Sequence, residues 1–275
     1  MNAKKSSLKA FTESVDRYND SQANSRFLSE IRSYNHLIVD ALQSIRMLKG
    51  LNVLDVGASP HGYALERVMA HGAARYLGIG LDIQQREELE FEAGGAELVN
   101  MNAEELTLPA SSFDVVVSMS TFEHIARPAQ ALAEIRRVLK PGGTALITFE
   151  PVWTASYGHH LHHFGEVAKL VPAWSHLIWT REEFEDQLGQ AWPHDAPLTV
   201  AQAAHWTYDG GALNRIGVQS MRKVFQDCGM HCEWLVPLMD IPQDPARLKL
   251  ASERTGLGAG ELMTKGLSVL LHQHH

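Results

Sequence analysis

The chain has few of the residues that would mark a secreted or membrane protein. It contains only two cysteines in 275 residues, Cys228 and Cys232, which excludes a disulfide framework and a four-cysteine zinc site. No stretch approaches 18 consecutive apolar residues, so no membrane span is expected. No apolar segment follows the polar residues Met1–Lys9, so we predict no signal peptide and a cytoplasmic location.

The sequence also lacks an excess of positive charge. Lysine and arginine number 24 against 32 aspartates and glutamates, which gives a formal net charge of −8 with histidine neutral. This charge argues against a broad basic surface for nucleic acid and against binding to an anionic membrane. The hydrophobic fraction of 45% and the charged fraction of 20% are typical of a soluble globular protein with a sizeable core.

Short apolar runs alternate with amphipathic segments along much of the chain. Leu51–Val56, for example, ends at a glycine as a buried strand does, and Phe113–Ser118 is a second clear strand. This alternation predicts an α/β fold with a mostly parallel, doubly wound sheet. We expect strands at 51–56, 76–81, 96–100, 113–118, 144–149, 232–237 and 266–271, and helices at 63–71, 84–92, 129–139, 218–228 and 244–254.

Two segments fall outside the alternation. Residues 10–48 carry apolar side chains at helical spacing, which predicts a helical N-terminal lid over residues 1–49. Residues 151–217 are rich in His, Trp and Pro and too long for an ordinary connection, so we expect an inserted helical cap that binds substrate. Its tryptophans suit either a substrate wall or the cap's own core. The sheet is then shared between residues 50–150 and 218–275.

The turn Asp55–Gly62 joins the first expected strand to a helix. Its small residues let the backbone approach a ligand, and the helix that follows begins with unpaired N–H groups. Asp82 ends the next strand, 20 residues after Gly62, where a carboxylate suits ribose hydroxyls. The turn alone could be a tight connection without a ligand, but together with Asp82 it predicts a nucleoside-bearing cofactor.

Four short motifs carry a resemblance to a known family. They are Val53–Gly57, Asn102–Leu106, Ser112–Val116 with Phe122–Ile125 after it, and Arg137–Gly143. In this order and spacing the chain resembles a class I S-adenosylmethionine-dependent methyltransferase of the small-molecule, type 11-like group. The resemblance implies a Rossmann-like, mostly parallel, seven-stranded sheet whose cofactor-binding core is residues 50–150, with S-adenosylmethionine as cofactor and S-adenosylhomocysteine as product.

The resemblance also implies a role for each matching residue. The turn should wrap the methionine and ribose parts of the cofactor, Asp82 should bind the ribose hydroxyls, and Ile83 should lie against the adenine. Asn102 and Ala103 should meet the adenine edge, and Met119 and Ser120 should line the methionine side. The expected cofactor-binding residues are thus Asp55, Gly57, Ala58, Ser59, Gly62, Asp82, Ile83, Asn102, Ala103, Met119 and Ser120.

Two positions depart from the family pattern. Ser59 stands where glycine is usual, and Asn102 stands where aspartate is usual, although its amide oxygen can still accept a hydrogen bond from adenine. The Ser59-Pro60 pair is similar to the variant turn of some RNA methyltransferases, which makes RNA an alternative substrate. The net charge of −8 and the lack of a Lys/Arg stripe argue against it.

Candidate catalytic groups follow from the chemistry. A hydroxyl nucleophile needs a general base, and histidine is the usual choice near neutral pH. Glu123 and His124 come just after the fourth strand, so we expect them to face the cofactor, although they could also only cap the next helix. Some relatives hold a divalent cation with Glu-x-x-Glu-His and a distant His, but Ser120 replaces the first Glu here. We therefore assign no metal ligand and leave a divalent metal open.

The run Tyr157–His163 is the most unusual feature of the sequence. It could supply a catalytic base, for which His160 is the candidate, it could form a hydrogen-bonded surface run, or it could bind Zn, Ni or Fe through imidazoles. If the run is helical, His159 and His163 share a face.

The substrate is expected to be a small metabolite, a natural-product intermediate or a sugar, methylated on oxygen or, second, on nitrogen. Tyr208, Asn214 and Arg215 could contact it, and Arg215 would suit a carboxylate or phosphate. A non-catalytic, cofactor-binding regulatory module is the other alternative to an enzyme. Neither a membrane nor a nucleic-acid partner is predicted, and a homodimer is left open.

Overall fold

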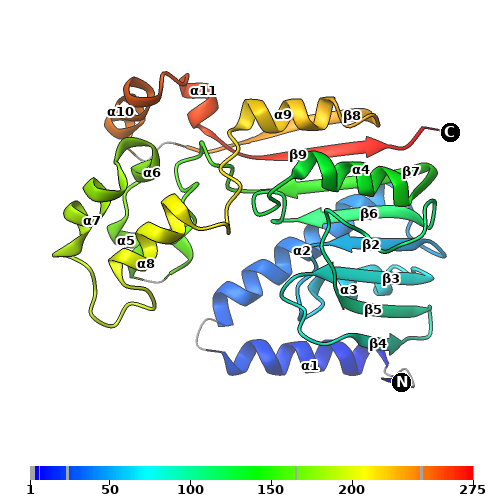
Figure 1. Ribbon diagram of the computed structural model, residues 1–275. Helices are drawn as coiled ribbons and strands as arrows, with labels where there is room; N and C mark the ends of the chain where they lie inside the picture. Colours follow the sequence, from blue (N-terminus) through cyan, green and yellow to red (C-terminus); the bar gives the residue numbers. More distant parts are fainter. Residues whose placement is uncertain (1–3, 6, 23–24, 165, 242–243, 275) are drawn as a thin grey trace.

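The computed structural model describes residues 4–5, 7–22, 25–164, 166–241 and 244–274, and Figure 1 shows their arrangement. One twisted sheet forms the centre, with helices on both faces and a group of short helices beyond one end of the strands. The α/β fold predicted from the alternating pattern is confirmed. Among the described residues, no helix is both long enough and apolar enough to cross a bilayer.

The sheet has nine strands in the order β1-β4-β5-β3-β2-β6-β7-β9-β8. All seven expected strands are present. The two additional ones, β1 (Lys4–Lys5) and β4 (Glu87–Glu90), extend the edge beside β5. The seven are β2 (Asn52–Val56), β3 (Arg75–Gly80), β5 (Gly95–Asn100), β6 (Phe113–Met119), β7 (Leu139–Phe149), β8 (His231–Met239) and β9 (Thr264–His272).

The centre of the sheet is parallel, from β5 through β3, β2 and β6 to β7. The last hairpin differs, because β9 runs antiparallel to both β7 and β8. The chain builds β2, β3 and β5 in one direction and then returns to the other side of β2 to add β6, in register Val53↔Val115. Such a change of direction opens a crevice at the carboxyl ends of the two central strands.

The helix expected at 84–92 is wrong. The segment forms β4, which pairs antiparallel with β5, and a tight turn between Phe91 and Gly94 joins the two strands. The reason is visible in the burial pattern, where Leu89 is buried and Phe91 is half-buried while Glu88 and Glu90 point elsewhere. Apolar residues two positions apart are typical of a strand. In so short a segment that is rich in glutamate, the same pattern also fits a helix, so the strand was not recognised.

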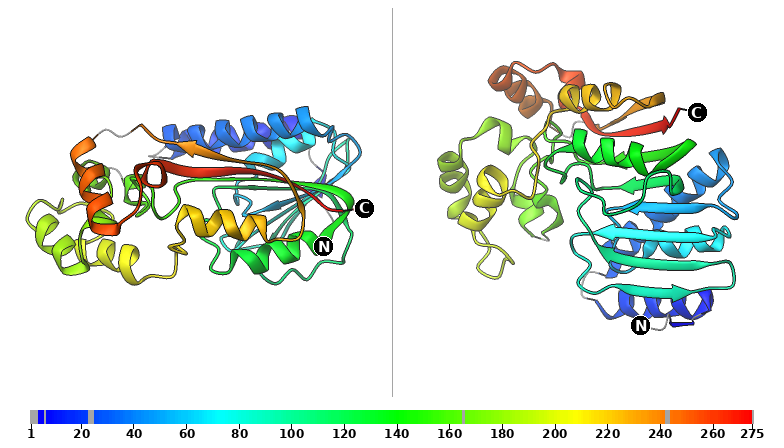
Figure 2. Two further views of the ribbon diagram at one scale, coloured as in Figure 1. Left: turned by 90° about the horizontal axis from the view of Figure 1, so that it is seen from above. Right: turned by 45° about the vertical axis from the view of Figure 1, so that its right-hand side comes forward.

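Helices cover both faces of the sheet. On one face lie α1 (Leu8–Ser21), α2 (Ser25–Ile45) and α3 (Tyr63–Ala70), and on the other lie α4 (Pro128–Val138) and α9 (Val218–Gln226) (Figure 2, left). The helical N-terminal segment is thus two helices. An ion-pair network ties it to the core, since Arg32 of α2 donates at 2.9 and 2.6 Å to the buried Glu66 of α3.

The cap segment, residues 151–217, forms short helices beyond the carboxyl ends of the strands (Figures 1 and 2). They are η1 (Leu161–His163), α5 (Val167–Leu170), α6 (Ser175–Ile178), α7 (Arg181–Gly189), α8 (Val200–Ala204) and η2 (His205–Asp209). They pack around Phe184 in an apolar cluster of their own, which takes in Trp179, Trp192 and Trp206. Most of the cap's tryptophans therefore serve its core.

Two further helices lie between β8 and β9, next to the cap. They are α10 (Pro245–Thr255), which matches the helix expected at 244–254, and α11 (Ala259–Leu262). Trp174 of the cap is fully enclosed and donates its indole N–H to the carbonyl of Leu262 at 3.2 Å. The cap is thereby held against the antiparallel end of the sheet.

Candidate functional site

A cavity of about 800 Å³ lies at the carboxyl ends of the central strands. Several parts of the chain line it: α2 through Tyr34, the turn after β2, the residues that follow β3, β6, β7 and β8, the cap, and β9 through Lys265. The cavity therefore lies in the crevice where the topology places a ligand.

The turn after β2 is shaped by glycine. Gly57 has φ +86°, and a Cβ there would lie 1.9 Å from the Thr121 hydroxyl oxygen, so no other residue fits without a shift. The N–H groups of Gly57 and Ala58 both donate to the carbonyl of Ile79 at 2.8 Å, which ties the turn to β3. Gly57, Ala58 and Ser59 line the cavity, whereas Gly62 begins α3 at φ +68° against Phe11.

Asp55 lies beneath this turn. Its carboxylate is buried and accepts a hydrogen bond of 2.6 Å from the hydroxyl of Tyr76. Burial raises the pKa of Asp55 to about 7 from 3.8, and the hydrogen bond from Tyr76 opposes that rise. Asp55 thus supports the turn from inside the core.

The residues after β3, with Pro60 and with Leu98 of β5, form an adjoining hollow of about 340 Å³, whose lining does not include Asn102 or Ala103 among the described residues. Asp82 is exposed and borders both the cavity and the hollow, while Ile83 is buried in the wall of the hollow. Asn102 accepts a hydrogen bond from the N–H of Glu104 at 2.9 Å, and Ala103 packs on the core. Asn100 was missed in the sequence: its amide donates to the carbonyls of Leu81 and Ile83 and joins the two loops.

Met119 and Ser120 end β6 at the cavity wall. Ser120 has φ +46°, an uncommon conformation for a residue other than glycine, and its N–H donates to the carbonyl of Thr148 at 2.9 Å. The kink turns the chain so that Glu123 and His124 return to the cavity.

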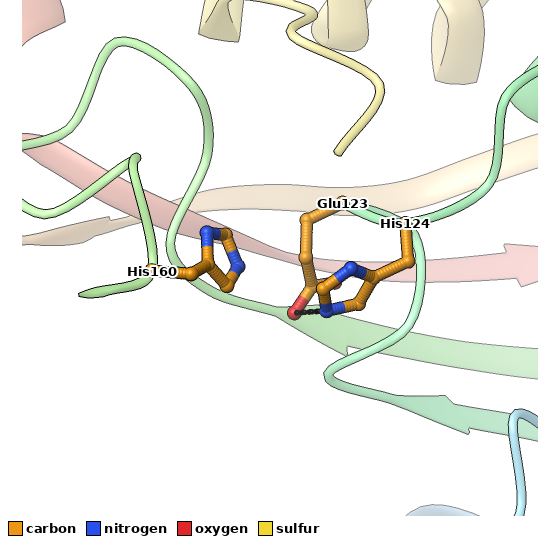
Figure 3. A group of neighbouring side chains, drawn as sticks. All are labelled: Glu123, His124 and His160. Atoms are coloured by element: carbon orange, nitrogen blue, oxygen red, sulfur yellow. Dashed lines mark ion pairs between the residues drawn. The ribbon is translucent and has the colours of Figure 1, made fainter. Parts of the chain in front are cut away.

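Three side chains meet in the cavity beyond this kink, as Figure 3 shows: Glu123, His124 and His160. The nearest carboxylate oxygen of Glu123 lies 4.0 Å from Nε2 of His124, and the rings of His124 and His160 lie 5.0 Å apart between centroids. One ligand-type atom from each lies within 4.8 Å of the others. The sequence placed all three as catalytic candidates, although 36 residues separate His160 from His124.

The backbone orients both imidazoles. Nδ1 of His124 lies 2.7 Å from the carbonyl of Ala212, and Nδ1 of His160 lies 2.9 Å from the carbonyl of Gly158. A carbonyl only accepts, so Nδ1 of each neutral ring carries the proton and Nε2 carries the lone pair. Such an Nε2 can take a proton from a substrate or ligate a metal.

The charged form of Glu123 is unfavourable in its surroundings. Its side chain is 4% exposed, and its second oxygen has no hydrogen-bond partner in the part of the chain that the structure describes. Burial, with repulsion from Glu150, raises the pKa of Glu123 well above its ordinary value. A buried carboxyl in this state is often functional, because the fold alone gains nothing from it.

Comparison with known proteins agrees with this geometry. Residues 54–147 match the family model described as a methyltransferase domain. A ubiquinone biosynthesis O-methyltransferase of Hahella chejuensis is 29% identical over 74% of this chain and 85% of its own. A probable S-adenosylmethionine-dependent methyltransferase of Mycolicibacterium smegmatis is 29% identical over 74% of this chain and 77% of its own.

Residues 54–147 thus form a methyltransferase domain, and the similarities support a class I S-adenosylmethionine-dependent methyltransferase. A solved structure of a methyltransferase of Haloferax volcanii, in complex with a methyltransferase activator, shares the fold at a TM-score of 0.52 and 18% identity, with 95% of this chain and 98% of that chain covered. The resemblance inferred from the four motifs is thus confirmed, and with it an enzyme rather than a regulatory module.

The methyltransferase's cofactor, S-adenosylmethionine, fits the residues present. The turn Gly57–Ser59 lines the cavity, with Thr121 packed against Gly57 from the other side, and Asp82 offers an exposed carboxylate that borders both the cavity and the adjoining hollow. Both features suit a ribose with its adenine on one side and a methionine chain on the other.

Several residues of this enzyme's cavity were missed in the sequence. Tyr34 hydrogen-bonds with Thr148 at 3.0 Å, Glu150 pairs with Lys265 at 2.9 Å, and the hydroxyl of Ser156 donates to Asp240 at 2.6 Å. They come from α2, the ends of three strands and the cap, so no local motif marks them. Tyr34 appeared only as one apolar position of a helical stripe.

The cap's polar residues serve other purposes than predicted. The guanidinium of Arg215 donates to the carbonyls of Thr207 and Gly210 and lies over the ring of Trp153, so its role as an anion ligand is not supported. Tyr208 donates to the carbonyl of Trp179. The amide of Asn214 donates to the carbonyls of Phe122 and Ile125, on either side of Glu123 and His124.

The histidine run is only partly helical. His159 is buried and its Nδ1 accepts the N–H of Leu161 at 3.0 Å, while His160 takes a left-handed conformation with φ +60°. His160 and His162 line the cavity. The side chain of His163 lies outside the described part of the chain, so the predicted pairing of His159 with His163 stays a prediction.

Proposed function

We propose that this methyltransferase transfers a methyl group to an oxygen, or alternatively a nitrogen, of a small metabolite, natural-product intermediate or sugar. One observation carries the proposal: Glu123, His124 and His160 border the same cavity as the turn after β2 and Asp82. Two basic imidazoles beside a cofactor pocket suit a nucleophile that must lose a proton, as a hydroxyl does.

In this proposal the cofactor half of the cavity consists of Gly57, Ala58, Ser59, Asp82, Met119 and Ser120. S-adenosylmethionine supplies an electrophilic methyl group when it is bound there. The backbone of the turn holds the methionine part, Asp82 accepts from the ribose hydroxyls, and Ile83, Asn102 and Ala103 form the adenine side. Asp55 and Gly62 support the turn.

The acceptor half consists of Tyr34, Glu123, Glu150, Ser156, Tyr157, His160, Phe164, Trp206, Asp240 and Lys265, with His124 between the halves. His160 takes the proton of the acceptor at Nε2, because the carbonyl of Gly158 holds its other nitrogen protonated. The cap and the N-terminal helices exclude water from the reacting groups. We propose these two segments as substrate cap and lid on that basis.

A cavity with three acidic side chains in its acceptor half also favours a small molecule over RNA, because an RNA backbone needs cationic contacts. The Ser59-Pro60 turn is then a variant without consequence for the substrate class. A homodimer stays a prediction, to be checked by light scattering.

The test is methyl transfer to a panel of hydroxyl and amine acceptors, followed by mass spectrometry. We expect His160→Gln to lower turnover by about 100-fold while the affinity for S-adenosylhomocysteine stays the same. His194→Gln, at an exposed position in the cap, is the matched control. Equal turnover in His160→Gln would exclude His160 as the base.

A metal arm belongs to the same test, because the three ligand-type atoms also suit a divalent cation. Loss of turnover on treatment with EDTA, restored by Mn²⁺ or Zn²⁺, would replace the general base by a metal site. Full activity in EDTA supports the base.

A further inference from the structure

The acceptor half of the cavity has more acidic side chains than described cations to pair with them. Its carboxylates are Glu123, Glu150 and Asp240, and its one lysine, Lys265, pairs with Glu150 at 2.9 Å. Asp240 accepts from the hydroxyl of Ser156, and no described cation forms an ion pair with it. Arg215, the nearby arginine that the sequence suggested for an anionic group, is held by backbone carbonyls.

We infer that the acceptor half selects a methyl acceptor that carries a protonated amine. The inference rests on the proposed function of the same cavity and names its substrate class. It excludes acceptors whose only charged group is a carboxylate or phosphate, since such a group would be desolvated beside carboxylates of the same sign.

Glu123 gives the second, independent reason. One of its carboxylate oxygens is buried without a partner among the described residues. Glu123 lines the cavity, and its side chain lies beside those of His124 and His160 (Figure 3). Leaving a buried polar group unpaired is costly. An ammonium group would donate to that oxygen and would offset both the burial of the carboxylate and its repulsion by Glu150.

The remaining wall suits the rest of such a molecule. Tyr157, Phe164 and Trp206 offer aromatic faces, and each is only partly buried by the protein. Aromatic faces bind flat or apolar groups and also attract cations. The cavity therefore combines ring surfaces with carboxylates, as expected for a ring that bears an amine.

Two matched series of probes test this inference. The first is 3,4-dihydroxyphenethylamine, 4-ethylcatechol and 3,4-dihydroxyphenylacetate, and the second is glucosamine, glucose and glucuronate. Within each series the ring stays the same and the substituent is cationic, neutral or anionic. Binding to the protein saturated with S-adenosylhomocysteine is measured by calorimetry in EDTA, so that neither turnover nor a metal ion enters the result.

In at least one series we expect the amine to bind about tenfold or more tightly than the neutral compound, with the acid weakest. Asp240→Asn and Glu123→Gln should each reduce that ratio, whereas Asp186→Asn, at an exposed position of the cap, should leave it unchanged. The affinity of each variant for S-adenosylhomocysteine shows that its cofactor half is folded.

The inference is overturned if neither amine binds more tightly than its neutral partner, or if both cavity variants keep the full preference. It is also overturned if the preference appears only with added Mn²⁺, because the acidic side chains then bind a metal ion and not the amine itself. Wild-type protein that binds S-adenosylhomocysteine but shows no amine preference defeats this inference alone. Failure to bind the cofactor product, or to methylate any acceptor, defeats the proposed function instead.

Discussion

The proposed cofactor half of the cavity is built from short local motifs, whereas the proposed acceptor half is gathered from distant parts of the chain. The turn from Gly57 to Ser59, Asp82 and the Met119-Ser120 pair each follow directly on a strand of the parallel sheet. Tyr34, Glu150, His160, Asp240 and Lys265 share no motif and meet only through the fold. A common cofactor therefore leaves a local signature, and a particular acceptor does not.

The largest effect is expected on cofactor affinity, from a substitution in the cofactor half. Gly57→Ala places a Cβ in contact with Thr121 and forces an alanine into φ +86°, so we expect S-adenosylhomocysteine to bind by about 3 kcal/mol less tightly, roughly 100-fold. Calorimetry measures the change. Gly211→Ala, where a Cβ meets nothing within 4 Å, should bind as the parent does. Unchanged affinity in Gly57→Ala would show that the turn does not approach the cofactor.

Asp82→Ala should come next. Removing the carboxylate that accepts from the ribose hydroxyls should weaken S-adenosylhomocysteine by about 2 kcal/mol, since hydrogen bonds to a charged group contribute about 1.5–3 kcal/mol. The same titration with Glu92→Ala, an exposed glutamate of the β4–β5 turn, provides the control. If both variants bind alike, the ribose lies elsewhere.

The burial of Asp55 should make the free energy of unfolding depend on pH. Its pKa is 3.8 before burial and about 7 in the folded protein, so the folded state holds a proton that the unfolded chain releases between these values. The free energy of unfolding therefore falls as the pH rises through this interval. Asp55→Asn removes that titration and should narrow the stability difference between pH 5 and pH 8 by roughly 2 kcal/mol.

Chemical denaturation at the two pH values measures this difference, with Asp186→Asn as the exposed control. A variant whose stability keeps the parent's pH dependence would show that Asp55 is ionised in the fold throughout.

The smallest effect should fall on the acceptor half. Tyr34→Phe removes the hydrogen bond to Thr148 and should cost about 1 kcal/mol of transition-state stabilisation, a few-fold in kcat/KM for the acceptor. The affinity for S-adenosylhomocysteine should not change. If affinity for S-adenosylhomocysteine falls as much as kcat/KM, Tyr34 of α2 contributes equally to the cofactor half and the acceptor half. The two halves would then not be independent.

The core was predictable because its signals are local. Each strand of the parallel centre is a short apolar run that ends in a glycine or a polar residue, and such a run has few other uses. The segment 84–92 failed because two apolar residues among glutamates, Leu89 and Phe91, fit a helix about as well as a strand. There, pairing with β5 decided the outcome.

The catalytic candidates were predicted for a different reason. Glu123 and His124 follow a strand, which fixes their end of the sheet, and His160 stood out by composition alone. Arg215 shows the limit of that reasoning. Its charge suggested an anion, but the backbone carbonyls of Thr207 and Gly210 satisfy its guanidinium, a contact that no spacing in the sequence announces.

The segment Ala212–Asn214, where the cap returns to the core, makes four hydrogen bonds to the loop after β6. Ala212 holds the proton on Nδ1 of His124, the N–H of Asn214 donates to the carbonyl of Glu123, and its amide bridges Phe122 and Ile125. One short stretch of backbone thus fixes both the tautomer of His124 and the position of Glu123. If these residues act as proposed, a displacement of the cap would change the proton positions at the site, and acceptor entry would be coupled to the chemistry.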